Sequence, residues 1–154
     1  MYLKLITASP YPKFEVYEED KVVMRIKIDP EMQAVRITHN ENRRVFFLAE
    51  EKLRKMTVTT LLNEYSQPLG TLIKDKSNGS GKIEVEGTKL RYSMTDRPNK
   101  EITLFEINTR FEVLNCKIEN EALLPALNNI SYLLFSLSWF TFLVKEKKED
   151  LQFA

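Results

Sequence analysis

The sequence offers few side chains that could carry out catalysis. It contains one cysteine, Cys116, and one histidine, His39. One cysteine cannot form an intramolecular disulfide, and one cysteine with one histidine is too few ligands for a structural zinc site. His39 lies in a His-Asn-Glu-Asn stretch, so we expect an exposed turn residue rather than a general base. Cys116 precedes Lys117, which could lower its thiol pKa, but a lone cysteine is more often buried and inert.

Two short motifs could bind ions, and both lack a required part. The acidic cluster Glu18–Glu19–Asp20 lacks the spacing and the glycine of a calcium-binding loop, so we expect a solvated turn. Gly79–Ser80–Gly81 is not followed by Lys-Ser or Lys-Thr, which favours a flexible turn over a phosphate-binding loop. No nucleophile, base and acid can be combined into a catalytic group. We therefore expect a protein that is not an enzyme and that uses no metal or cofactor.

Basic side chains remain as candidates for ligand contacts, because phosphate groups bind where several Lys or Arg donors converge. The first group, on two expected strands, would share one face of a sheet if those strands pair in a suitable register. A pair of adjacent arginines and a run near residue 54 form two further basic spots. The alternative is that all of them only make the outer surface soluble. The candidate contacts to an anionic ligand are Arg25, Lys27, Arg36, Arg43, Arg44, Lys52, Arg54 and Lys55.

Length and composition indicate one ordinary globular domain over residues 1–154. Hydrophobic residues make up 43% of the chain and charged residues 29%, which is ordinary for a globular protein and argues against disorder. The formal net charge is +1, whereas a nucleic-acid-binding domain is usually strongly basic. The first ten residues are too short and mixed for a signal peptide. We expect a cytoplasmic protein, peripheral to a membrane if it contacts one.

Alternating apolar and polar residues predict strands over about residues 2–116. Met24, Ile26 and Ile28 alternate with Arg25 and Lys27. Short turn clusters between such runs favour about eleven antiparallel strands. Because the chain has only four glycines, we expect Asn and Asp at the bent positions of most turns. The same alternation recurs at Val35/Ile37, Met56/Val58, Ile83/Val85, Leu90/Tyr92/Met94 and Phe111/Val113.

A very hydrophobic segment near the C-terminus determines the expected architecture. No charged residue occurs between Ala122 and Val144, and the densest part is Ile130–Val144. This length could cross a bilayer, but Pro125 and a pair of asparagines favour burial inside the protein. A helix that is apolar on all sides must be surrounded, and a closed sheet of about eleven strands leaves room inside.

The sequence therefore predicts a closed antiparallel β-barrel of about 11–12 strands around a C-terminal helix at about 121–144, followed by a charged tail at 145–154. The alternative is a smaller barrel capped by an outside helix, as in pleckstrin-homology-like domains. The segment Ala49–Lys55 is expected to be a charged connection, although one or two helical turns would also fit its composition.

Strands in hairpins followed by one hydrophobic helix resemble the tubby C-terminal-like fold. The likeness is carried by three segments, 62–73, 82–92 and 122–144. This group includes the tubby proteins, the phospholipid scramblases, the LURP-one-related proteins and small bacterial relatives. The resemblance implies a barrel around a central helix and, as a partner, an anionic phospholipid bound by cationic residues on the outside or rim of the barrel. The acidic calcium motif of scramblases is not seen near the helix, and a protein partner without any lipid is the alternative.

Overall fold

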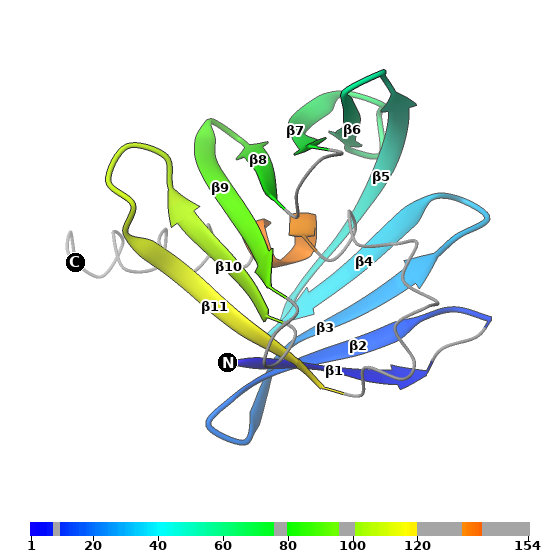
Figure 1. The fold of residues 1–154 in the computed structure, drawn as a ribbon. Helices are drawn as coiled ribbons and strands as arrows, with labels where there is room; N and C mark the ends of the chain where they lie inside the picture. The colour runs from blue at the N-terminus through cyan, green and yellow to red at the C-terminus, as the bar shows by residue number, and fades with distance from the viewer. Residues whose placement is uncertain (8–9, 76–79, 96–100, 120–133, 140–154) are drawn as a thin grey trace, which may run out of the picture.

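The computed structural model describes residues 1–7, 10–75, 80–95, 101–119 and 134–139 of the chain. The described part is mainly β-structure with one short helical segment (Figure 1). The strands are β1 (Tyr2–Thr7), β2 (Lys13–Glu18), β3 (Lys21–Asp29), β4 (Ala34–His39), β5 (Asn42–Lys52), β6 (Met56–Leu62), β7 (Pro68–Asp75), β8 (Ser80–Val85), β9 (Thr88–Thr95), β10 (Glu101–Glu106) and β11 (Glu112–Glu119).

These eleven strands form a closed barrel in which each strand pairs with its neighbours in the sequence. Every such pair is antiparallel, as short connections require. The barrel is closed by β1 and β11, which run parallel and pair Leu3 with Ile118. Among the described strands, closure therefore leaves none at a free sheet edge. The predicted closed barrel of about eleven strands is confirmed.

The inner face of the barrel follows the predicted alternation along most strands. On β3, Met24, Ile26 and Ile28 are buried, whereas Arg25 and Lys27 are exposed. The same arrangement buries the apolar residues of β4 and β8. Burying apolar side chains on one face of every strand is the main driving force for closing the sheet.

Two alternating runs face the opposite way from the prediction. In β6 the buried residues are Thr59 and Leu61, so Met56 is exposed instead of pointing inward. The register explains this, because Leu61 pairs with Leu48 of β5, which is itself buried. A shift of one residue moves a whole strand to the other face, and local alternation alone does not fix that choice.

At the last strand, Phe111 and Val113 are likewise exposed, with Phe111 at 70%. The buried face of β11 is formed instead by Leu114, Cys116 and Ile118. A register irregularity between Leu104 and Phe105 of β10 accompanies this reversal, because a bulge changes which residues of the paired strand face inward.

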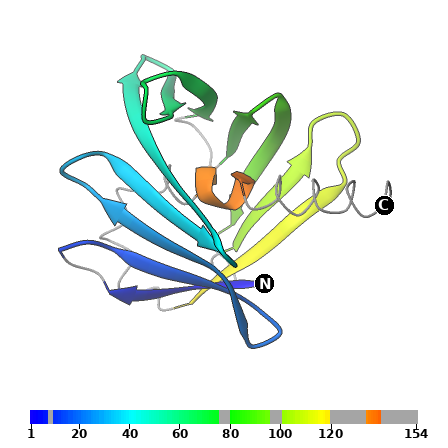
Figure 2. The ribbon, with the colours of Figure 1, turned by 180° about the vertical axis from the view of Figure 1, so that it is seen from behind.

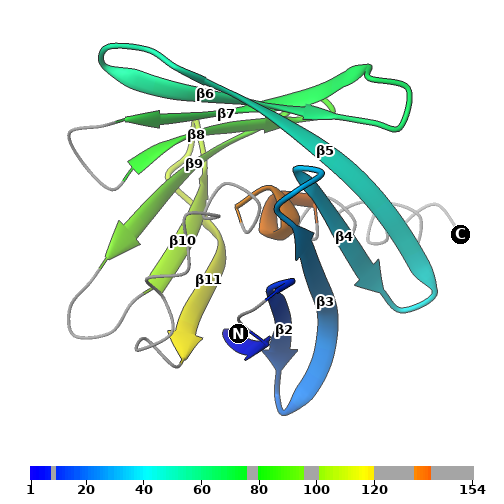
Figure 3. The same ribbon diagram turned by 90° about the vertical axis from the view of Figure 1, so that its right-hand side faces the viewer.

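Residues 134–139 are helical and lie inside the barrel. Leu134, Phe135, Leu137 and Trp139 are each at most 2% exposed and belong to the same core cluster as the strand residues. Opposite views show the segment, in orange, surrounded by strands (Figures 1 and 2). From the side it lies between β6–β8 and β2–β3 (Figure 3). The prediction of a buried helix holds for this segment; the remainder of 121–144 and the tail lie outside the described residues.

The helical segment makes an aromatic contact with the barrel and a side-chain hydrogen bond within itself. The Trp139 ring meets Phe46 of β5 edge to face, with ring centroids 5.7 Å apart, a favourable aromatic geometry. The Ser138 hydroxyl donates a hydrogen bond of 2.8 Å to the Leu134 carbonyl oxygen one turn earlier. Among the described residues, no helix has the length and apolar character needed to cross a membrane.

The turns differ from the prediction in two ways. First, seven non-glycine residues of the described chain have a left-handed backbone, and only two of them, Asp20 and Asn40, are Asp or Asn. The others include Gln33 and Arg110. Second, the segment expected as a charged connection is mostly strand, because β5 continues to Lys52. Charged residues at the end of a hairpin remain solvated while their backbone stays paired, so charge alone did not mark the strand's end.

Two glycines give a stability prediction. A methyl group on Gly81 of β8 would meet the Ile73 carbonyl oxygen and the Tyr92 ring, whereas one on Gly87 would meet nothing within 4 Å but would have to adopt a φ of +86°. We expect Gly81→Ala to destabilise the protein by about 3 kcal/mol through overpacking, and Gly87→Ala by about 1 kcal/mol through backbone strain. Urea unfolding of both variants measures the difference; equal losses would contradict the close approach of β7 and β8.

Candidate functional site

A row of outward-facing side chains crosses β7, β8, β9 and β10. Ile73 pairs with Lys82, Lys82 with Arg91, and Arg91 with Phe105. Two cations therefore stand directly opposite each other, with an apolar side chain at each end of the row. Like charges in such a cross-strand pair repel each other and destabilise a sheet, so this arrangement is unfavourable for folding alone.

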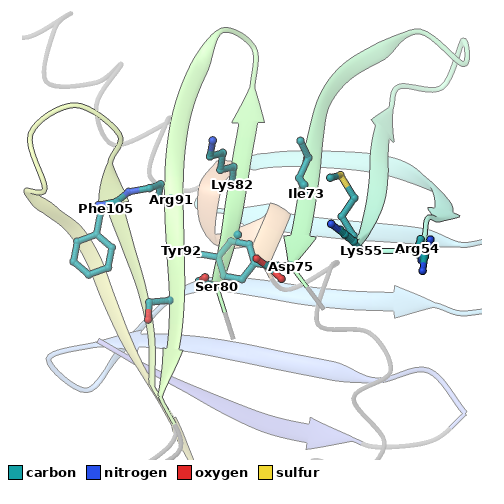
Figure 4. Close-up of a pocket in the computed structure, with 12 residues that line it drawn as sticks. Arg54, Lys55, Ile73, Asp75, Ser80, Lys82, Arg91, Tyr92 and Phe105 are labelled. Atoms are coloured by element: carbon teal, nitrogen blue, oxygen red, sulfur yellow. The ribbon is translucent and has the colours of Figure 1, made fainter. Parts of the chain in front are cut away.

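The row borders an open cavity of about 1190 Å³, which we call the β6–β10 pocket. Figure 4 shows its lining side chains, with Lys82 and Arg91 on neighbouring strands and Arg54 and Lys55 across from them at the β5–β6 hairpin. The pocket thus combines cations with apolar walls. Its lining residues are Arg54, Lys55, Met56, Ile73, Asp75, Ser80, Gly81, Lys82, Arg91, Tyr92, Ser93 and Phe105.

The charge of the β6–β10 pocket is clearly positive. Four cationic side chains, Arg54, Lys55, Lys82 and Arg91, line it together with one carboxylate, Asp75. The Nε atom of Arg91 is buried and has no hydrogen-bond partner among the described residues. A buried donor without an acceptor costs free energy, so a bound anion that accepted this hydrogen bond would be stabilised.

Tyr92 also borders the pocket, but from the inner face of the sheet, because it follows Arg91 on β9 and belongs to the core cluster. It is 2% exposed, and its hydroxyl has no hydrogen-bond partner in the described part of the chain. Its ring extends toward Asp75 in Figure 4. Burial, with a smaller contribution from the Asp75 charge, raises the pKa of Tyr92 from 10.0 to about 12. The phenol therefore stays protonated and able to donate at any physiological pH.

The structure brings together some of the predicted contacts with two residues that the sequence reasoning missed. Arg54 and Lys55 line the pocket, and Lys52 lies at the adjoining end of β5, opposite Thr57. The missed cations are Lys82 and Arg91. Their signal was the short turn after Val85, since pairing Val85 with Thr88 sets Lys82 opposite Arg91.

Another group of predicted contacts lies on the outer face of β3, β4 and β5. Lys27 pairs directly with Arg36, and Arg25 and Arg43 both pair with Thr38. Arg25, Lys27 and Arg36 thus share one face. This surface borders a smaller cavity of about 290 Å³ that includes Lys27, Arg36 and the carboxylate of Asp29. The Lys27 ammonium lies 5.5 Å from the centroid of the Tyr11 ring, which gives that cation a partner within the protein.

Arg43 and Arg44 do not form one basic spot. Adjacent residues of a strand point to opposite faces, and Arg44 lies on the side of the barrel's interior, where it pairs with Ile37. Its guanidinium carbon lies 5.1 Å from the centroid of the Phe46 ring and 5.9 Å from that of Trp139. Arg44 is exposed but makes cation–π contacts with Phe46 and with the core helix, so it is not part of the outer basic surface.

The lone histidine and cysteine are both buried. His39 is 7% exposed at the end of β4, so the expectation of an exposed turn residue is wrong; its side chain follows the inward alternation of Val35 and Ile37. Cys116 is fully buried on β11. In the part of the chain that the structure describes, no three His, Cys, Asp or Glu side chains lie together in a way that could hold a metal ion.

Comparison of the chain with protein-family models, with curated proteins and with solved structures found no match.

Proposed function

We propose that this protein is a non-enzymatic binding module that takes the head group of an anionic phospholipid into the β6–β10 pocket. The observation that carries the proposal is the direct pairing of Lys82 with Arg91 beside Arg54 and Lys55, with a single carboxylate in the pocket. Several cations that converge on one cavity suit a phosphate, which presents several strong acceptor oxygens.

The apolar walls favour a lipid over a free inorganic anion. Met56, Ile73 and Phe105 line the same cavity as the cations. A phospholipid combines a charged phosphate with an uncharged glycerol and acyl portion, so it can satisfy both kinds of surface at once. The buried Nε of Arg91, on the same outer face as Lys82, supplies a donor that would gain an acceptor on binding.

The same proposal relates the protein to the tubby C-terminal-like fold. The support is the sequence resemblance together with a closed barrel around a buried helix. The chemistry proposed for the pocket matches what that resemblance implies, namely cationic side chains on the outside of the barrel. The proposed location is the cytoplasmic surface of a membrane, where anionic lipids concentrate.

Removing three pocket charges tests the proposal. We expect Arg54→Gln/Lys55→Gln/Lys82→Gln to lower the affinity for vesicles of phosphatidylcholine and phosphatidylglycerol by about 100-fold at low salt, as measured by co-sedimentation. The reason is that each basic residue near an anionic surface contributes about 1 kcal/mol. All three side chains are exposed, and Lys82→Gln removes the repulsion from Arg91, so the melting temperature should not fall.

The matched control removes three exposed cations from the other basic surface. Arg25→Gln/Lys27→Gln/Arg36→Gln changes the net charge equally but leaves the β6–β10 pocket intact. We expect this variant to keep most of the vesicle affinity. If both triple variants lose affinity equally, only net charge matters and the pocket is not the site. If the unchanged protein binds neither these vesicles nor glycerophosphate at low salt, lipid binding is excluded and a protein partner becomes the better hypothesis.

A further inference from the structure

The tip of the β5–β6 hairpin combines apolar and cationic side chains in one short turn. Leu53 and Met56 flank Arg54 and Lys55, and the Leu53 amide donates a 2.9 Å hydrogen bond to the Met56 carbonyl oxygen. This bond closes the turn and holds the two apolar residues opposite each other. Leu53 is 41% exposed and Met56 38% exposed, although both would be more stable out of water.

The tip lies at the edge of the molecule and next to the β6–β10 pocket. Figures 1 and 3 both show the β5–β6 hairpin reaching the outer limit of the barrel. Arg54, Lys55 and Met56 belong both to this tip and to the pocket lining. A surface that contacted the tip would therefore lie directly beside the pocket.

The composition of the tip selects one kind of surface. Lys52, Arg54 and Lys55 are exposed, and the long stems of such side chains let their charges stay at the level of lipid head groups while apolar neighbours lie deeper. Paired apolar and cationic side chains are the combination by which peripheral proteins enter the interface of an anionic bilayer. A protein surface would need to match a narrow turn in shape, whereas a fluid bilayer adapts to it.

We propose that the β5–β6 hairpin tip inserts Leu53 and Met56 into the interface of an anionic bilayer and thereby places the β6–β10 pocket at the level of the lipid head groups. This inference rests on the proposed head-group binding and adds to it an orientation of the barrel on the membrane. Neighbouring residues have separate roles: Leu53 and Met56 set how deeply the tip enters the bilayer, and the cations favour bilayers with negatively charged lipids.

A single labelled cysteine tests the insertion. Leu53→Cys adds an accessible thiol to a chain whose one native cysteine, Cys116, is fully buried. The added thiol can therefore be labelled selectively with an environment-sensitive NBD fluorophore. On addition of phosphatidylcholine–phosphatidylglycerol vesicles we expect a blue shift and a rise in NBD emission. The matched control is Tyr65→Cys, which is 82% exposed in the β6–β7 turn at the opposite end of β6; its label should not respond.

The outcomes separate this inference from the proposed function. If the protein sediments with the vesicles but the NBD emission at position 53 does not shift, insertion is overturned and head-group binding stands. A shift at both positions would also overturn it, because the tip would then not be the oriented contact. If neither vesicles nor glycerophosphate bind, both proposals fail together.

An unlabelled variant gives an independent measurement. Leu53→Ser removes one apolar side chain without changing the pocket lining, and we expect about tenfold weaker vesicle binding. Binding of glycerophosphate, which needs only the pocket, should be unchanged. Equal vesicle affinity of Leu53→Ser and the unchanged protein would contradict insertion.

Discussion

Leu134→Asp is expected to prevent the protein from folding. Leu134 is fully buried within the barrel, and an unpaired carboxylate there would lose its hydration without gaining a partner. The helical segment belongs to the same core cluster as the strands, so displacing this segment would also expose the apolar inner face of the barrel to water. We expect no cooperative thermal transition, and emission from Trp139 shifted to longer wavelength, because this sole tryptophan is 2% exposed in the folded protein.

Two further variants make the test quantitative. Leu134→Ala should fold but lose about 2–5 kcal/mol of stability, the usual range for a large-to-small change in a core. Leu53→Asp introduces the same charge at a side chain that is 41% exposed and should change stability by less than about 1 kcal/mol. A Leu134→Asp protein with a normal melting transition would show that the helical segment is not part of the core.

The architecture could be predicted because it depends on properties that are summed over many residues. A period of two over most of the chain requires a sheet with one buried face, and an uncharged segment must be enclosed by something. Leu134 and Trp139 are buried for this reason. The direction in which β6 and β11 face could not be read in the same way, because apolar residues occur on both faces: in β6, Met56 and Val58 lie on one face and Leu61 on the other.

The candidate site was predicted only in part, because a site depends on the register between strands. Arg54 and Lys55 are adjacent in the sequence and were recognised, whereas Lys82 and Arg91 meet only through the β8–β9 pairing. That register follows from the two-residue turn Glu86–Gly87, both of whose residues have positive φ, as tight hairpins require. Conversely, Arg43 and Arg44 are neighbours in sequence yet lie on opposite faces, so adjacency in a strand is a poor guide to a shared site.

The free energy of unfolding should decrease in alkaline solution because the Cys116 thiol is buried in the folded protein. Burial raises the pKa of this thiol from 9.0 to about 12, against a smaller lowering by the N-terminal amine. The pKa of the Cys116 thiol is higher in the folded protein than in the unfolded chain. The free energy of unfolding is therefore unaffected by this thiol below pH 9 and decreases as the pH rises toward 12, because only the unfolded chain can ionise it there. The full difference corresponds to about 4 kcal/mol, of which about 2 kcal/mol should be lost by about pH 10.5.

Comparison with Cys116→Ala separates this effect from the titration of lysines and tyrosines. The variant lacks the thiol, so between about pH 8 and about pH 10.5 its unfolding free energy in urea should fall by about 2 kcal/mol less than that of the unchanged protein. Any loss of packing in the variant is the same at both pH values and cancels in this comparison. Tyr92 remains in both proteins, and its pKa of about 12 adds an equal alkaline loss to each. Identical pH dependence of the two proteins would mean that the thiol is solvated, and that β11 does not turn Cys116 toward the barrel's core.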